Sequence, residues 1–285
     1  MARRTVYWHI GPDDPGTEFL GEALLTRRDE LAEHGIAAPT GAWHEVEAQI
    51  WKHKGLSLLS TPACARADQD QVDLRLTGLR GVEVHLVVLV RDLPTQVHAA
   101  WQAGIQHGST TPLTSYAERV LDPDRAHWQA EEFWTGRDLG TFLPRWAATI
   151  RPDRVHVVAT PAGPDAIWEA FLHLVGIRDL PRPQRPVPRA LAAETDPERV
   201  LDITTSWSKL LADRGFDLHG SLISSGLTPV PAGPGDVFDA LTDLLTTTRA
   251  EADRLARETH RLRQENARLD RKHRLHKRRL AELIR

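Results

Sequence analysis

The stretch that decides the fold reads Thr5-Val-Tyr-Trp-His-Ile-Gly-Pro-Asp-Asp-Pro-Gly-Thr-Glu-Phe-Leu20. Residues Thr5–Ile10 are rich in β-branched and aromatic side chains, which predicts a buried strand. Gly11–Gly16 then predicts a tight turn, and Thr17–His34 has the apolar spacing of a helix. A strand, a glycine-containing turn and a helix form the frame of a phosphate-binding loop, because backbone N–H groups at the start of the helix point at an anion.

The charge of this loop is opposite to that of an ordinary phosphate site. Asp13, Asp14 and Glu18 stand where a cation and hydroxyl groups would help to hold a phosphate. Carboxylates at these positions repel an anionic ligand. The sequence therefore predicts the frame of a phosphate-binding loop without its usual charge.

Strands and helices alternate along the first two thirds of the chain, which predicts an α/β fold with a parallel sheet and crossover helices. The expected strands are Thr5–Ile10, Leu56–Ser60, Val82–Val90 and Val155–Thr160. The expected helices are Thr17–His34, Trp43–His53, Gln69–Leu79, Thr95–His107, Leu139–Ile150 and Asp165–Val175. We expect a three-layer domain over residues 1–180, with Thr5–Ile10 and Val82–Val90 as neighbouring or near-neighbouring parallel strands.

The segment His9-Ile-Gly-Pro-Asp-Asp-Pro-Gly-Thr-Glu-Phe-Leu20 resembles the 5′-phosphosulfate loop of bacterial sulfotransferases, which usually reads His-x-Gly-x-x-Lys-Thr-Gly-Thr-Thr-x-Leu. Gly11, Gly16, Thr17 and Leu20 match that pattern position by position. Asp14 falls on the family's lysine. The resemblance implies a P-loop fold in which Gly11, Gly16 and Thr17 bind the cofactor, phosphoadenosine phosphosulfate.

A second segment, Val87-Val-Leu-Val-Arg-Asp-Leu-Pro-Thr-Gln-Val-His-Ala-Ala-Trp-Gln102, is similar to the family's strand-loop-helix in which an arginine holds the cofactor's 3′-phosphate. Arg91 and Asp92 match, while Ala99 replaces a serine. The stretch from Arg91 to His107 is similar to an actinobacterial branch of the family. The resemblance thus adds Arg91 to the cofactor-binding residues, with a salt bridge to Asp92 or a neighbour as its alternative role.

Two functions follow from the resemblance. In the first, the phosphosulfate site is degenerate, the cofactor binds weakly or not at all, and the protein serves as an assembly or adaptor protein. In the second, the chain is an active sulfotransferase that moves a sulfuryl group to a hydroxyl or amine. The first is favoured because the missing lysine normally stabilises the transferring group.

Few other residues in the sequence are candidates for catalysis or metal binding. His44 and His53 are weak candidates for a catalytic base, because they lie where an acceptor pocket could form. The histidines show no zinc-binding spacing, and Cys64 is the single cysteine, so we predict no metal site and no metal cofactor. The run Thr5–Ile10 is too short for a secretory signal or a membrane span, so we expect a cytoplasmic protein.

The C-terminal third changes in character. A segment rich in Pro and Gly, 181–235, is expected to add a helix near Pro197–Arg214 that packs on the domain. Residues 236–285 contain no Pro or Gly and fit a heptad repeat with Leu255, Leu262 and Leu269 at d positions and Asn266 at an a position. This pattern predicts a parallel two-stranded coiled coil and hence a homodimer. The alternative is a single amphipathic helix that docks on its own domain.

The expected C-terminal helix is basic. From Arg249 onward, Arg and Lys outnumber Asp and Glu by about two to one, whereas the chain as a whole has a net charge of −3. A solvated helix face is the first interpretation of this charge, and docking on an acidic protein partner is the second. Nucleic acid is not expected as a partner, because zipper dimers that read the major groove carry their basic segment before the zipper.

Overall fold

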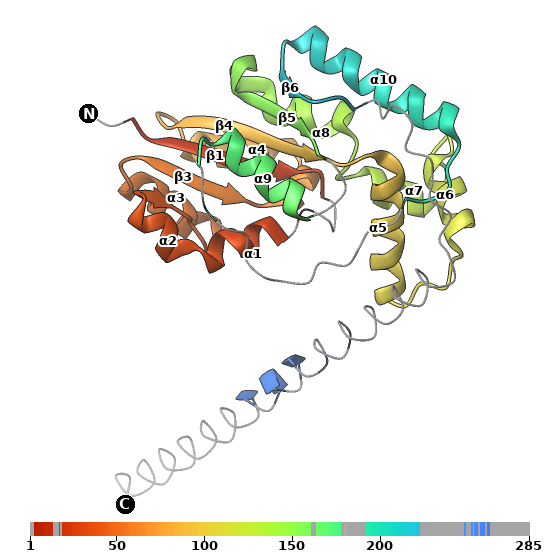
Figure 1. Cartoon of the computed structure of the whole chain (residues 1–285), viewed down its shortest axis with the longest axis horizontal. Coiled ribbons are helices and arrows are strands. Elements are labelled where there is room, and N and C mark those ends of the chain that lie inside the picture. The colour runs from red at the N-terminus through yellow and green to blue at the C-terminus, as the bar shows by residue number, and fades with distance from the viewer. Residues whose placement is uncertain are drawn as a thin grey trace, which may run out of the picture. The chain divides into compact units, whose positions relative to one another are not determined.

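The structure is a computed structural model, and it describes residues 3–13, 17, 19–160, 164–177, 180, 192–222, 248, 252, 254–255, 257–259 and 261–262. The chain divides into two units, Met1–Pro231 and Ala232–Arg285. The first unit is an α/β body built on a six-stranded sheet in the order β2-β3-β1-β4-β5-β6 (Figure 1). All five strand pairs are parallel.

The elements follow one another along the body as crossover connections require. The strands are β1 (Thr5–Gly11), β2 (Ile36–Ala37), β3 (Leu56–Ser60), β4 (Glu83–Val90), β5 (Val155–Ala159) and β6 (Asp217–His219). The helices are α1 (Phe19–Thr26), α2 (Arg28–Glu33), α3 (Trp43–Lys52), α4 (Gln69–Gly78), α5 (Leu93–Gln106), α6 (Leu113–Leu121), α7 (Trp128–Trp134), α8 (Leu139–Trp146), α9 (Pro164–Leu174) and α10 (Pro197–Arg214). Short 3-10 turns lie at Pro62–Arg66, Ala147–Thr149 and Pro152–Arg154.

Both faces of the sheet are covered, because its central strands are apolar on both sides. In β4, Val84, Leu86, Val88 and Val90 enter the larger core, which α3, α4, α5, α6, α7, α8 and α10 complete. Val87 and Leu89 point to the opposite face and pack with α1, α2 and α9 in the second core. A near-continuous apolar run is what a strand buried on both faces requires.

Indole rings fill the middle of the larger core. Trp8 of β1 is fully buried and stacks on Trp43 of α3, with ring centroids 5.0 Å apart. The edge of Trp146 from α8 meets the same ring at 5.0 Å. The aromatic character of Thr5–Ile10, which predicted a buried strand, is thus explained by packing against two helices.

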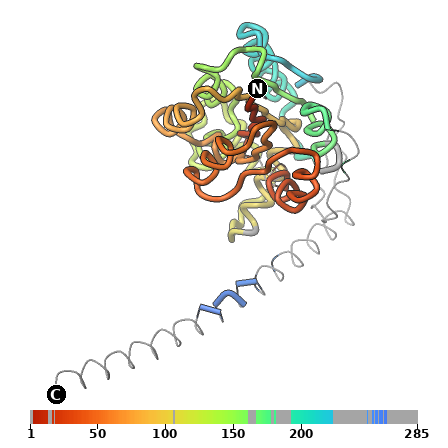
Figure 2. The backbone as a smooth tube through the Cα atoms, turned by 90° about the vertical axis from the view of Figure 1, so that its left-hand side faces the viewer, coloured from red at the N-terminus to blue at the C-terminus, as the bar shows by residue number. Residues whose placement is uncertain are grey.

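The predicted arrangement of the central strands is confirmed: β1 and β4 are adjacent and parallel, with Tyr7 beside His85 and Gly11 beside Val88. β2 and β6 are the outer strands of the sheet, and the orange-red segments that follow β1 lie on the other side of the body from the cyan segments (Figure 2).

The expectation for Thr17–His34 needs correction, because the structure has two helices there, separated at Arg27 with φ −98° and ψ 15°. The α/β domain also extends past residue 180, because β6 completes the sheet from within 181–235. β6 was missed because Asp217–His219 is short and largely polar. The expected helix Pro197–Arg214 is confirmed as α10, with Asp196 as its N-cap and Gly215 at its end.

Most of the expected coiled coil lies outside the described residues. Its described positions, between 248 and 262, are helical, and Leu255 and Leu262 are about half exposed there. The coiled coil therefore stays a prediction. No helix among the described residues is both long and apolar enough to cross a membrane.

Candidate functional site

The carboxyl edge of the sheet brings together the two segments singled out in the sequence. Gly11 ends β1, and Arg91 directly follows β4 on the neighbouring parallel strand. Parallel α/β sheets bind ligands in the crevice outside the carboxyl ends of their strands. Of the predicted cofactor-binding residues, Gly11, Thr17 and Arg91 are described, whereas Gly16 lies outside the described residues together with Asp14 and Glu18.

Gly11 is required by its surroundings. Its φ is +146°, in a region that favours glycine, and a Cβ built on it would lie 2.7 Å from the Cβ of Ala65. The chain thus leaves β1 in close contact with the 3-10 turn that follows β3. This close approach fixes the direction in which the loop departs.

The loop is anchored at Asp13. The backbone N–H of Asp13 donates to the carbonyl oxygen of Gly136, at 2.9 Å, in the turn between α7 and α8. The Asp13 carboxylate forms an ion pair with the guanidinium of Arg66. Gly136 has no room for a side chain, because a Cβ there would lie 2.8 Å from that of Asp13. One of the loop's acidic charges is therefore compensated from within the protein.

Thr17 is fully buried beyond the loop. Its hydroxyl donates to the carbonyl oxygen of Pro12 at 3.3 Å, and its own carbonyl oxygen accepts from the N–H of Leu20 at 3.1 Å. The sequence resemblance predicts that Thr17 binds the cofactor. In this structure its hydroxyl and carbonyl groups join the loop to the first turn of α1.

Arg91 is almost entirely buried, with 4% of the residue exposed. Its carbonyl oxygen accepts from the side-chain amide of Gln96 at 2.7 Å. The carboxylate of Asp92 accepts from the N–H of Thr95 at 2.9 Å and thereby caps α5. The turn after β4 is thus fixed by α5, and a buried cation stands at the carboxyl edge.

Two further buried polar side chains follow Arg91 on α5. The Oε1 atom of Gln96 and the Nδ1 atom of His98 have no hydrogen-bond partner in the described part of the chain. Burial, and second the positive charge of Arg91, lowers the pKa of His98 from 6.5 to about 4. His98 is therefore neutral at pH 7 and can offer one donor and one acceptor. Buried polar atoms without partners are uncommon and favour a site that a ligand completes.

The remaining histidine candidates are not gathered at one place. His44 is exposed in the first turn of α3. His53 caps the end of α3 and hydrogen-bonds to the carbonyl oxygen of Gly35 at 3.0 Å, next to the amino ends of β2 and β3. The structure therefore does not bring His53 together with Gly11 and Arg91. His9 is fully buried, and its Nδ1 lies 2.9 Å from the Ser60 hydroxyl at the end of β3.

Sequence reasoning missed Arg66, Gln96 and His98. Arg66 reaches Asp13 across 53 residues of chain, so no local pattern indicates the pair. Gln96 and His98 fall at ordinary helix positions in the sequence, although both follow Arg91 closely within α5. Two polar side chains on the buried part of a helix that starts at a ligand-binding edge are a signal that could have been used.

Comparison with known proteins adds little to this geometry. No protein-family profile matches the chain, and no curated protein matches it. A solved structure described as a sulfotransferase from Alicyclobacillus acidocaldarius matches with a TM-score of 0.42 and 12% identity, over 73% of this chain and 93% of that chain. A similarity this low supports no argument about function. A function for this chain has to be argued from its own residues.

Proposed function

We propose that the body is a sulfotransferase-like binding domain with a degenerate phosphosulfate site, and that the protein acts as an assembly or adaptor protein. The observation that carries this proposal is the ion pair between Asp13 and Arg66 at the loop. A carboxylate there occupies a cation that an anionic cofactor would otherwise use. Together with Asp14 in the position of the family's lysine, it leaves the developing charge of a transferring sulfuryl group poorly stabilised.

Arg91 supports residual binding of a nucleotide. A buried guanidinium at the carboxyl edge makes charge-assisted, bidentate hydrogen bonds to a phosphate group well. The unpartnered atoms of Gln96 and His98 add neutral hydrogen-bonding groups beside it. The expected ligand is therefore adenosine 3′,5′-bisphosphate, bound weakly and without sulfuryl transfer.

The assembly role rests on the second unit, taken by itself. Leu255 and Leu262 are seven residues apart in helical positions, and 53% and 49% of them are exposed. Large apolar side chains that recur every seven residues on a helix are typical of a coiled-coil seam. We propose a homodimer through this helix, with an acidic protein as the further partner of its basic face.

A second candidate function is an active sulfotransferase in which Arg66 replaces the missing lysine. The position of Arg66 favours it, because this arginine reaches the loop from the 3-10 turn after β3. The cation would stabilise the transferring group once the cofactor displaced Asp13 from the pair.

Calorimetric titration with adenosine 3′,5′-bisphosphate tests the proposal. We expect weak binding to the unmodified protein, and binding about fivefold tighter in Asp13→Asn, because the removal of one carboxylate near a phosphate changes the energy by about 1 kcal/mol. Asp14→Lys with Glu18→Thr, which restores the family's residues, should tighten binding further. Asp29→Asn, on the exposed surface of α2, is the matched control and should leave the affinity unchanged.

A transfer assay separates the two candidate functions. The protein is incubated with phosphoadenosine phosphosulfate and a mixture of phenol and amine acceptors, and release of adenosine 3′,5′-bisphosphate is followed by chromatography. Micromolar binding together with release that Arg66→Met abolishes would establish the active enzyme instead of the degenerate site.

Light scattering tests the assembly role. The full chain is compared with a chain that ends at Gly235, at equal concentration. We expect a dimer for the first and a monomer for the second. Two monomers would contradict the coiled coil and leave docking of the helix on a body as the explanation.

A further inference from the structure

A row of ring side chains crosses the sheet near the amino ends of its strands, on the face that α1 and α9 cover. Tyr7 of β1 lies beside His85 of β4, and His156 of β5 lies beside Asp217 of β6. The Tyr7 and His85 rings stack with centroids 4.4 Å apart, and the His85 and His156 rings are parallel at 5.2 Å. The row continues to His219, two residues after Asp217, so it spans four strands.

Three side chains at the β5–β6 end of this row can share one metal ion. The Asp217 carboxylate lies 2.8 Å from Nδ1 of His156 and 2.8 Å from Nε2 of His219. All three ligand atoms lie within 4.8 Å of one another. Zinc binds imidazole nitrogen and carboxylate oxygen at about 2.0–2.1 Å, which sets neighbouring ligand atoms about 3.3 Å apart. Small side-chain movements are enough to reach that spacing.

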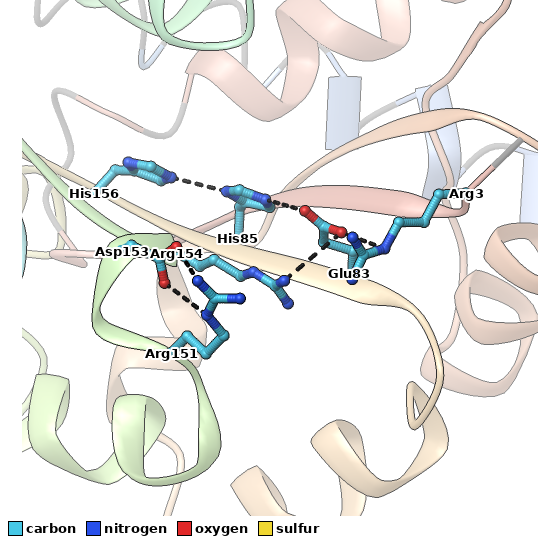
Figure 3. Close-up of polar contacts among 7 residues, drawn as sticks. All are labelled: Arg3, Glu83, His85, Arg151, Asp153, Arg154 and His156. Carbon is cyan, nitrogen blue, oxygen red and sulfur yellow. Dashed lines mark hydrogen bonds and ion pairs between the residues drawn. The ribbon is translucent and has the colours of Figure 1, made fainter.

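The other nitrogen of His156 is held as a metal-bound histidine requires. Its Nε2 lies 2.9 Å from Nδ1 of His85, and Nε2 of His85 lies 3.1 Å from the carboxylate of Glu83 (Figure 3). Such a carboxylate behind a ligand histidine fixes the tautomer and the orientation of the ring. Arg3 and Arg154 pair with Glu83 in turn and hold it in place.

The contacts along this row suit a cation at the Asp217 end. With a metal ion on the lone pair of Nδ1, the Nε2–H of His156 donates to Nδ1 of His85, and the Nε2–H of His85 donates to the Glu83 carboxylate. Both hydrogens then point toward Glu83, and each donor in the row meets an acceptor.

We propose that His156 Nδ1, Asp217 and His219 Nε2 form a zinc site that fastens β6 to β5. The side chain of His156 is 9% exposed, whereas those of Asp217 and His219 are 44% and 42% exposed. The ion is thus reached from solvent, and a water molecule completes its tetrahedral shell. The spacing rules used on the sequence did not indicate this site, because its ligands come from two strands that are 61 residues apart.

Titration of the full-length, chelator-treated protein with zinc chloride tests the site. We expect one strong equivalent, and affinity at least about tenfold weaker in His219→Ala and in Asp217→Asn, since even an outer-shell partner accounts for tenfold. Both variants change partly exposed positions of an edge strand, and circular dichroism verifies that they fold. His34→Ala, which removes an exposed histidine that contacts the carbonyl oxygen of Glu30, is the matched control and keeps the affinity of the unmodified protein.

Two further measurements distinguish this site from adventitious binding to surface histidines. Cobalt(II) should give the intense visible absorption of a tetrahedral site in the unmodified protein, and His219→Ala should lose it. Zinc should raise the melting temperature of the unmodified protein through mass action and leave that of His219→Ala unchanged. Equal zinc affinities for the unmodified protein and both β6 variants, or the absence of a strong equivalent, would overturn the proposal.

Discussion

Buried polar side chains at the two ends of the sheet differ in their hydrogen-bond partners. At the carboxyl edge, Gln96 and His98 carry buried atoms without partners in the described part of the chain, next to the guanidinium of Arg91. At the amino end, His85 and His156 contact each other and a carboxylate on either side. Open hydrogen-bonding capacity favours a polar organic ligand, whereas a row of joined imidazoles favours a metal cation.

The largest effect on stability is expected at Gly11, where the backbone leaves β1 at the carboxyl edge of the sheet. Gly11→Ala should lower the free energy of unfolding by about 3 kcal/mol, because the new methyl group collides with Ala65 and the backbone is strained as well. Gly35→Ala, at the amino end of β2, has a positive φ of +71° but open space, so its cost should be about 1 kcal/mol. Urea denaturation measures both, and equal losses would show that crowding at the carboxyl edge is unimportant.

Arg91→Met comes next and tests the carboxyl edge as an anion site. Loss of a buried charge-assisted hydrogen bond costs about 2 kcal/mol, so affinity for adenosine 3′,5′-bisphosphate should fall about thirtyfold. Arg28→Met removes a guanidinium from α2, where it contacts Gln49, and should leave binding unaltered. The measurement is calorimetric. An unchanged affinity in Arg91→Met would show that the guanidinium of Arg91 does not contact the bound anion.

His98 makes the carboxyl edge sensitive to pH. Its folded-state pKa of about 4 lies below the ordinary value of 6.5, so the unfolded chain binds more protons between these values. Stability should therefore fall as pH decreases from about 6.5 to about 4, by up to about 3 kcal/mol from this group, since one pKa unit corresponds to about 1.4 kcal/mol. His98→Phe keeps a ring in place and should flatten that part of the profile in parallel urea titrations. A profile identical to that of the unmodified protein would mean that His98 titrates normally.

The smallest effect concerns the amino end. His85→Phe preserves stacking on Tyr7 but removes both ring nitrogens that link His156 to Glu83. Zinc affinity should fall about tenfold, while the affinity for adenosine 3′,5′-bisphosphate stays the same. Paired titrations on one preparation provide the comparison. A fall in both affinities would indicate a general loss of packing and no specific link between the two rings.

Local sequence pattern predicted the elements that depend on continuous apolar segments. β1, β3, β4 and β5 were found because their side chains are buried on both faces. Gly11 and Arg91 were placed together because the ends of adjacent parallel strands share one edge. β6 escaped because a three-residue strand with Asp217 and His219 has no such pattern.

Contacts between distant parts of the chain could not be predicted in this way. The pair Asp13–Arg66 is 53 residues apart, and the pair His156–Asp217 is 61 residues apart. Each depends on strand order and register, which composition and spacing do not encode locally. For the same reason, the position of His53 at the amino end, away from Arg91, became evident only from the fold.

The edge strands of the sheet affect how copies of this protein associate. β2 has two residues and β6 has three, so the outer strands expose few unpaired backbone groups. Long open edges invite strand addition from other chains and hence aggregation. Such short margins, one of them bearing Asp217 and His219, discourage it. Strand addition between two bodies at these edges is therefore disfavoured.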